Sequence, residues 1–190
     1  ASLVCLVGSE MCIRDSFLAT LAPMIDFKNK LVPLIETSRA IETVTQIAAF
    51  KDVVGLFFGA ADASASLGCK LAWEPLLYAR HRVVLAASMF NLFTIDAPYF
   101  YIDKMAGLKE EAEAVKNLGF TGKAAIHPDQ IDYINEAFSP SAEEKAEAKK
   151  VLEEYQKSGG GAIKVDGQMI DEPIAEAMRL KITLGEEEKK

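Results

Sequence analysis

The 190-residue sequence has only three cysteines, two histidines and one tryptophan, and it has no long hydrophobic run. Its longest apolar stretch, residues 53–61, is far shorter than the ~20 residues of a membrane-spanning helix. The formal net charge is −7, and the chain has no block of basic residues. Nonspecific binding to nucleic acid or anionic lipid needs a positively charged surface, so we exclude both of these function classes together with a membrane-spanning protein.

The number and spacing of the cysteines indicate the redox environment in which the protein is expected to occur. Cys5, Cys12 and Cys69 follow neither the spacing of metal ligands nor that of paired disulfides, which favours a reducing, cytoplasmic location. Half of the residues are hydrophobic, so the chain is expected to fold around a core of its own, as one domain or part of one.

The first sixteen residues differ from the rest. The stretch 6–15 resembles a sequencing-library adapter translated in frame, so we expect residues 1–16 to be non-native and the native sequence to begin near Phe17. A native strand and turn is the alternative.

Strand and helix patterns alternate from residue 31 onward. Apolar runs predict strands at 31–35, 53–58, 92–95 and 123–126, and the later helices are expected at 131–138, 142–157 and about 172–184. This alternation predicts an α/β fold with a parallel sheet. A closed eight-unit barrel takes ~250 residues. The four strand–helix units therefore indicate either a small open sheet or half of a barrel.

A polar residue follows each of these four strands. Glu36, Asp62, Asp96 and His127 are separated by 26, 34 and 31 residues, and a strand–helix unit takes ~30. Because active sites of α/β proteins form at the carboxyl edge of the sheet, we expect these side chains to share one cavity, with Glu36 and Asp96 binding substrate. Each acid could instead be a first-turn or capping residue of the next helix, and His127 could cap the helix after Pro128.

Glu36 and Asp62 are the best candidates for a metal pair. Two adjacent carboxylates repel each other, which raises one pKa or favours a bound cation. Mg²⁺ prefers such oxygen ligands and accepts substrate oxygens beside them.

Several motifs also resemble the citrate lyase beta-subunit family of the HpcH/HpaI aldolase superfamily, which includes malyl-CoA and citramalyl-CoA lyases. They are Pro-Leu-Ile-Glu-Thr at 33–37, Phe-Gly-Ala-Ala-Asp at 58–62, Leu-Leu-Tyr-Ala-Arg at 76–80, Gly-Phe-Thr-Gly-Lys-Ala-Ala-Ile-His-Pro-Asp-Gln at 119–130 and Asp-Gly-Gln-Met-Ile-Asp at 166–171. The motifs occur in the family's order and together cover about residues 31–184.

The resemblance implies the C-terminal half of a TIM-type (β/α)8 barrel over residues 17–157 and a C-terminal lid and tail over 158–190. It implies a lyase that cleaves a citryl, malyl or citramalyl thioester into an oxo acid and an acyl thioester carried by coenzyme A or an acyl carrier protein. Glu36 and Asp62 match the ligands of Mg²⁺, for which Mn²⁺ could substitute.

The remaining implied site residues come from two further motifs. Ile126, His127 and Pro128 match a loop that lines the thioester channel. Asp171 matches an acid that the lid delivers to the neighbouring subunit of a trimer, where it could protonate the thioester enolate. Other citrate lyase subunits are possible partners.

The sequence also departs from the family pattern. Ala61 stands where the family usually has an acidic residue, and the family's early strands and a substrate-binding arginine have no counterpart. We therefore expect this polypeptide to be an inactive, poorly soluble fragment when expressed alone. Two other functions remain open, namely a pyruvate-type aldolase that uses no thioester and a non-catalytic subunit that binds an acyl carrier.

Overall fold

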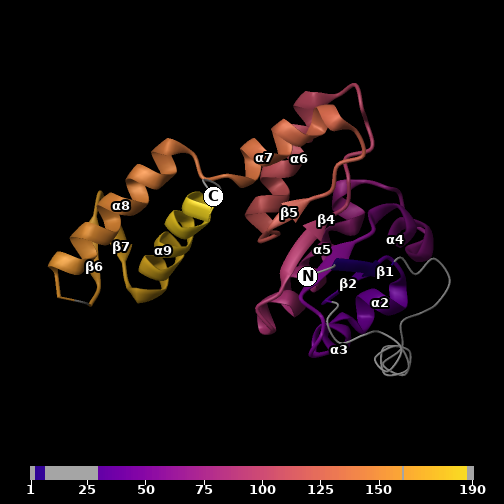
Figure 1. Cartoon of the computed structure of the whole chain (residues 1–190), viewed down its shortest axis with the longest axis horizontal. Coiled ribbons are helices and arrows are strands. Elements are labelled where there is room, and N and C mark those ends of the chain that lie inside the picture. The colour runs from indigo at the N-terminus through magenta and orange to yellow at the C-terminus, as the bar shows by residue number, and fades with distance from the viewer. Residues whose placement is uncertain (1–2, 7–29, 160, 188–190) are drawn as a thin grey trace. The chain divides into compact units, whose positions relative to one another are not determined.

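The computed structural model describes residues 3–6, 30–159 and 161–187, and the chain divides into two compact units, Ala1–Ile134 and Asn135–Lys190 (Figure 1). The division falls within the helix α7 (Ile131–Phe138). Among the described residues, no helix combines the length and the apolar character that a membrane crossing requires.

The first unit is an α/β structure. In chain order it contains β1 (Leu3–Leu6), β2 (Lys30–Ile35), α2 (Ser38–Glu42), α3 (Val44–Ala48), β3 (Gly55–Phe58), α4 (Ala60–Leu67), α5 (Trp73–Met89), β4 (Phe93–Asp96), α6 (Met105–Leu118), β5 (Gly122–Lys123) and the 3-10 helix η1 (Pro128–Gln130). The strands form one sheet in the order β1-β2-β3-β4-β5, and each neighbouring pair is parallel. This arrangement confirms the predicted α/β class, and parallel strands that alternate with helices are the repeating pattern of a TIM-type barrel.

The strand β1 comes from the segment that we expect to be adapter-derived. It pairs with β2 in parallel register, from Leu3 opposite Lys30 to Leu6 opposite Pro33. The remainder of residues 1–16, and the expected native start at Phe17, lie outside the described residues.

The core of the first unit forms between the sheet and its helices. The buried side of α5 is built from Leu76, Ala79, Val83 and Ala87, and this helix packs on β3 and β4 and on α2, α3 and α4. Burial of such apolar faces supplies most of the stability of helices this short.

Two elements differ from the sequence-based prediction. The helical pattern around residues 41–48 is divided into α2 and α3 at Thr43, whose hydroxyl donates to the Arg39 carbonyl at 2.9 Å and so competes with the helical hydrogen bonds. The strand expected at 123–126 is only Gly122–Lys123. The chain makes one more sheet hydrogen bond, from the Ala124 N–H to the Asp96 carbonyl at 2.9 Å, before it leaves the ladder.

The second unit consists of a long helix, a hairpin and a final helix. These are α8 (Ala142–Lys157), β6 (Ile163–Val165), β7 (Gln168–Ile170) and α9 (Glu172–Glu187). Ser141 and Glu144 cap α8 reciprocally. The two strands pair antiparallel, and both residues of the connecting turn, Asp166 and Gly167, have positive φ (47° and 89°), as a tight hairpin turn requires.

The boundary between the units differs from the one expected at residue 157. The buried face of α8, which includes Val151, Leu152 and Tyr155, packs with Val165 and Ile170 of the hairpin and with Ala175 of α9. Because α8 buries its apolar stripe there, it packs within the second compact unit. The division into a barrel part and a lid at residue 157 stays a prediction.

Candidate metal and active site

Glu36 and Asp62 lie together at the carboxyl edge of the sheet. The parallel register pairs Ile35 with Phe58, so the residues that follow them, Glu36 and Gly59, are neighbours where β2 and β3 end. The Gly59 N–H donates to the Ile35 carbonyl at 3.0 Å and continues the pairing. Asp62 follows in the first turn of α4. The side chain of Glu36 is therefore enclosed, at 3% exposure, whereas Asp62 faces solvent.

The charge state of Glu36 follows from this enclosure. The pKa of Glu36 is raised from 4.5 to about 7. Burial is the largest cause of this shift, and the charge of Asp62 and a hydrogen bond to Asp62 raise the pKa further. Since an ionised carboxylate can only accept hydrogen bonds, this bond requires a proton on one of the two groups.

The pair has the properties of a divalent-cation site. The Glu36 Oε1 atom is buried and makes no hydrogen bond in the part of the chain that the structure describes. Burying a polar atom without a partner is costly, and a cation would supply one. No cluster of three or more His, Cys, Asp or Glu side chains able to hold a metal occurs among the described residues. Two carboxylates fit Mg²⁺, which keeps several water ligands, and do not fit a metal that needs four protein ligands.

Asp96 is not part of this pair. It is fully buried, and its Oδ1 accepts from Arg80 Nε at 2.8 Å while its Oδ2 accepts from Lys123 Nζ at 2.9 Å. Lys123 also donates to the Ala97 carbonyl and to Glu111 Oε1, both at 2.7 Å. Both Asp96 oxygens are engaged, so substrate contact would require this network to open. Asp96 therefore supports the sheet edge through this network, and its expected role in binding substrate stays a prediction.

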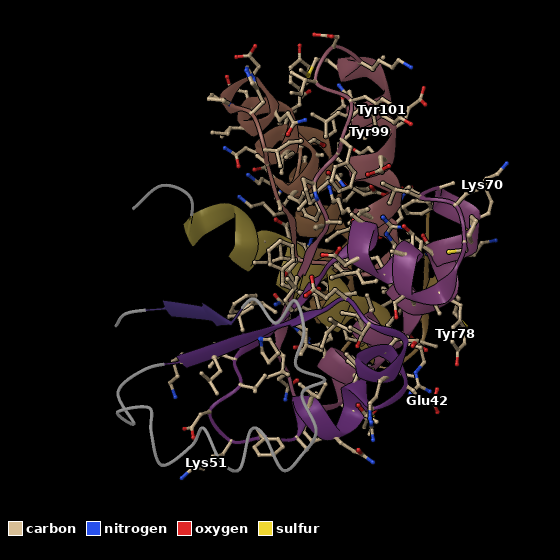
Figure 2. All side chains as sticks on the ribbon, turned by 90° about the vertical axis from the view of Figure 1, so that its right-hand side faces the viewer. Glu42, Lys51, Lys70, Tyr78, Tyr99 and Tyr101 are labelled. Carbon is tan, nitrogen blue, oxygen red and sulfur yellow. The ribbon has the colours of Figure 1, made fainter. Side chains whose placement is uncertain are left out.

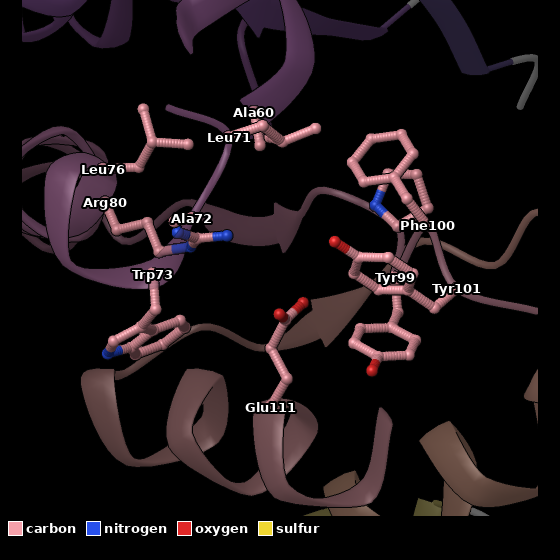
Figure 3. Close-up of a pocket in the computed structure, with 11 residues that line it drawn as sticks. Ala60, Leu71, Ala72, Trp73, Leu76, Arg80, Tyr99, Phe100, Tyr101 and Glu111 are labelled. Carbon is pink, nitrogen blue, oxygen red and sulfur yellow. The ribbon is translucent and has the colours of Figure 1, made fainter. Parts of the chain in front are cut away.

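A small cavity of about 70 Å³ lies beside the network (Figure 3). Arg80 of α5 and Glu111 of α6 face it from two directions, and Tyr99, Phe100 and Tyr101 line the side opposite Arg80. The Arg80 guanidinium carbon lies 4.7 Å from the centre of the Trp73 ring, which fixes the plane of the cation. The Arg80 Nη1 atom is buried without a hydrogen-bond partner among the described residues. The cavity is large enough to hold water, and the polar groups of Arg80 and Glu111 could bond to it.

The predicted thioester loop is partly exposed. Ile126 is 49% exposed, and Pro128 is exposed at the start of η1. His127 caps η1, because its Nδ1 accepts from the Asp129 N–H at 3.3 Å. This is the capping role that the sequence left open beside ligand binding. Ile126 and Pro128 present accessible apolar surface to a ligand.

Asp171 belongs to the second unit. Its Oδ1 accepts from the Ile174 N–H at 3.3 Å, and its carbonyl accepts from the Ala175 N–H at 2.9 Å, so it caps the start of α9. The side chain is half-buried. Its place in a neighbouring subunit's site remains a prediction.

Sequence reasoning missed the two cations that hold Asp96. Arg80 falls on the buried side of α5, four residues after Leu76 and three before Val83, and Lys123 interrupts an apolar strand pattern. A charged residue at a buried position is a signal for an internal ion pair, because an unpaired charge there is too costly. The same signal could have identified both.

Several known proteins are similar to this chain. Human mitochondrial citramalyl-CoA lyase is 36% identical over 170 residues, which cover 81% of this chain and 49% of that protein. A citrate lyase subunit beta-like protein of Mycobacterium tuberculosis is 34% identical over 151 residues, covering 76% of this chain and 55% of that protein. The chain thus spans about half the length of these curated relatives.

Two solved structures are also similar. CitE from Mycobacterium tuberculosis in complex with magnesium, acetoacetate and coenzyme A matches with a TM-score of 0.83 and 31% identity, over 97% of this chain and 68% of that one. RipC from Yersinia pestis matches with a TM-score of 0.66 and 38% identity, over 75% of this chain and 65% of that one. The family description HpcH/HpaI aldolase/citrate lyase matches residues 25–128, more than half of the sequence. The chain therefore belongs to the HpcH/HpaI aldolase/citrate lyase family.

Proposed function

We propose that this chain contributes the metal site of a Mg²⁺-dependent lyase that cleaves a β-hydroxyacyl thioester of the citryl, malyl or citramalyl type. The observation that carries the proposal is the placement of Glu36, whose buried Oε1 lacks a hydrogen-bond partner in the described chain, directly beside Asp62. The complex of CitE with magnesium, acetoacetate and coenzyme A supports the choice of metal and carrier.

The carboxylates of Glu36 and Asp62 would hold the cation. When bound, Mg²⁺ supplies positive charge that stabilises oxyanion character on the oxo acid or on the substrate hydroxyl. Glu36 would have to lose its proton to act as a ligand, and its contact with the cation would then take the place of the hydrogen bond to Asp62. Asp62, exposed at the start of α4, leaves the opposite side of the site open to water and substrate.

The reaction is a balanced carbon–carbon cleavage. The substrate hydroxyl gives its proton to water, and its oxygen forms the carbonyl of the oxo acid. At the same time the bond between the hydroxyl carbon and the thioester α-carbon breaks, and the electron pair of that bond moves to the thioester, which becomes an enolate. Protonation of the α-carbon completes the acyl thioester, and the oxo acid is released. We assign this proton transfer to Asp171 of a neighbouring subunit, following the family resemblance. Gly159 and Gly161, both with positive φ, precede the hairpin and suit a lid that moves.

Ile126, His127 and Pro128 are assigned to the thioester carrier. Ile126 and Pro128 offer exposed apolar surface beside the carboxyl edge of β5, which suits the alkyl part of a pantetheine arm. His127 has its Nδ1 engaged by the Asp129 N–H, so only its Nε2 can contact the carrier.

Calorimetric titration of the chain with Mg²⁺ and then with coenzyme A tests the proposal. We expect Mg²⁺ to bind, Asp62→Asn to abolish that binding, and coenzyme A to bind the chain whether or not Asp62 is replaced. Mg²⁺ binding without coenzyme A binding would favour a pyruvate-type aldolase. If the chain binds coenzyme A but not Mg²⁺, a non-catalytic subunit that binds an acyl carrier would be favoured.

A further inference from the structure

Gln130 is a neutral polar residue that is completely buried, at 0% exposure, at the end of η1. Both ends of its side-chain amide are hydrogen-bonded. Its Oε1 accepts from the Ile126 N–H at 3.0 Å, and its Nε2 donates to the Tyr99 carbonyl at 2.9 Å. Burial of an amide is favourable only when its donor and acceptor are both satisfied, so these two bonds explain why a glutamine can occupy this position.

The two bonds join the loop after β4 to the loop after β5. The last regular rung between these strands is the bond from the Ala124 N–H to the Asp96 carbonyl. In a parallel ladder the next N–H to donate would be that of Ile126, two residues further along. The strands diverge there, and the side-chain amide of Gln130 fills the gap between the Ile126 N–H and the Tyr99 carbonyl. The side-chain amide of Gln130 therefore continues the hydrogen bonding between the two loops beyond the last backbone bond of the sheet.

The loop after β4, which contains the Tyr99 carbonyl, is itself held in place by contacts with the rest of the first unit. The Tyr99 side chain is 9% exposed, and its hydroxyl lies so close to Gly107 of α6 that a Cβ on that glycine would overlap it. The Tyr99 and Tyr101 rings lie 5.5 Å apart between centroids, and Figure 2 places them at the same end of the unit. Lys123 Nζ donates to the Ala97 carbonyl in the same loop.

We infer that Gln130 is a positioning residue that fixes the backbone of Ile126 and thereby presents the exposed Ile126 side chain to the thioester carrier. This inference rests on the proposed function for the role of the loop, but the fixation of Ile126 depends only on the two hydrogen bonds. Ile126 is 49% exposed, so packing restrains its side chain less than it would restrain a buried one. Its position therefore depends more on the backbone, which Gln130 restrains through the Ile126 N–H.

Gln130→Met tests the inference, because it keeps the approximate length and volume of the side chain but removes both hydrogen bonds. We expect amide hydrogen exchange at Ile126 to accelerate about tenfold more than exchange in β2 and β3, since the amide loses its acceptor. Coenzyme A binding is expected to weaken about tenfold, whereas the Mg²⁺ affinity at Glu36 and Asp62 should stay within about twofold.

Val83→Ala is the matched control, because it removes buried methyl groups from α5 and leaves both loops intact. It should accelerate exchange throughout the first unit without a particular effect at Ile126, and it should leave coenzyme A affinity unchanged. Equal weakening of coenzyme A binding in both variants would reduce Gln130 to a purely structural residue and overturn the inference.

Two further outcomes separate the inference from the proposed function. If the unmodified chain binds no coenzyme A but Gln130→Met still releases the Ile126 amide, the role of the loop in carrier binding is overturned and the fixation of Ile126 is supported. Unchanged exchange at Ile126 overturns the fixation itself. If Gln130→Met does not fold, Gln130→Glu keeps an acceptor for Ile126 and replaces the donor to Tyr99 with an oxygen. Wild-type coenzyme A affinity in a folded, ionised Gln130→Glu variant would then refute the inference.

Discussion

The backbone of Gly59 passes so close to Glu36 that a Cβ on Gly59 would lie 2.7 Å from the Glu36 Cβ and 3.1 Å from its Oε2. Real Cβ contacts are longer, so only glycine leaves room for the enclosed carboxyl group. Gly59, which follows β3 and precedes α4, therefore allows Glu36 and the start of α4 to approach closely.

Replacing this glycine should disturb both stability and metal binding. We expect Gly59→Ala to lower the free energy of unfolding by about 1–3 kcal/mol, because the added methyl group overpacks the site, and to weaken Mg²⁺ binding by displacing Glu36. Gly122→Ala is the control, since a Cβ there meets no atom within 4 Å. Urea denaturation and Mg²⁺ titration measure the two effects. If Gly59→Ala and Gly122→Ala had the same unfolding free energy and the same Mg²⁺ affinity, the close approach of Gly59 to Glu36 would have no effect on stability or metal binding.

The carboxyl group of Asp62 contributes to the elevated pKa of Glu36. In Asp62→Asn we expect the pKa of Glu36 to fall from about 7 but to stay above 4.5, because burial is the largest cause of the shift and remains. Carbon-detected NMR titration of the Glu36 side chain measures this value. Asp132→Asn, at an exposed position of α7, should leave it unchanged. A pKa of 4.5 in Asp62→Asn would mean that burial has no part in the shift.

Stability should depend on pH through the same group. The folded-state pKa of Glu36, about 7, exceeds the ordinary value of 4.5, so between these values the folded state binds more protons than the unfolded state. The free energy of unfolding should therefore fall as the pH rises from 4.5 to 7, by at most about 3 kcal/mol. Glu36→Gln should remove this component of the decline. Denaturation curves at several pH values test the sign, and a component that rises over this range would contradict it.

Metal binding should show the complementary dependence. Because Glu36 has to be deprotonated to act as a ligand, we expect Mg²⁺ affinity to increase as the pH rises toward 7 and binding to release a proton below that pH. Calorimetry in buffers with different ionisation enthalpies counts the released protons. Binding with no proton release at pH 6 would place the cation elsewhere.

The buried ion pair of Lys123 with Asp96 should matter far more than an exposed pair of similar length. Lys123→Met leaves Asp96 with one cation instead of two, and we expect a loss of about 3–5 kcal/mol in unfolding free energy. Lys150→Met removes an exposed 2.6 Å contact with Asp166 and should cost much less. Urea denaturation of both variants gives the comparison, and equal losses would refute the role assigned to burial.

The sequence determined the α/β class, most element positions and the proximity of Glu36 to Asp62, because these follow from the periodicity of the pattern. The binding of a metal by these two residues stays a prediction. Strand–helix repeats of about 30 residues place successive strand ends at one edge, which was enough to select Glu36 and Asp62. The Ser141–Glu144 cap of α8 is also a local feature, because it involves residues only three apart.

Only the tertiary structure distinguished Asp96 from Glu36, although both acids follow a strand. Asp96 is neutralised by Arg80 and Lys123, which lie 16 and 27 residues away in the sequence, whereas Glu36 keeps an oxygen without a hydrogen-bond partner among the described residues. The cations reach Asp96 from a helix and from a neighbouring strand, so no local pattern around residue 96 records them. Likewise, the role of Gln130 depends on its hydrogen bond to the Tyr99 carbonyl, which lies 31 residues away in the sequence. Only the folded structure shows that these two residues are close in space.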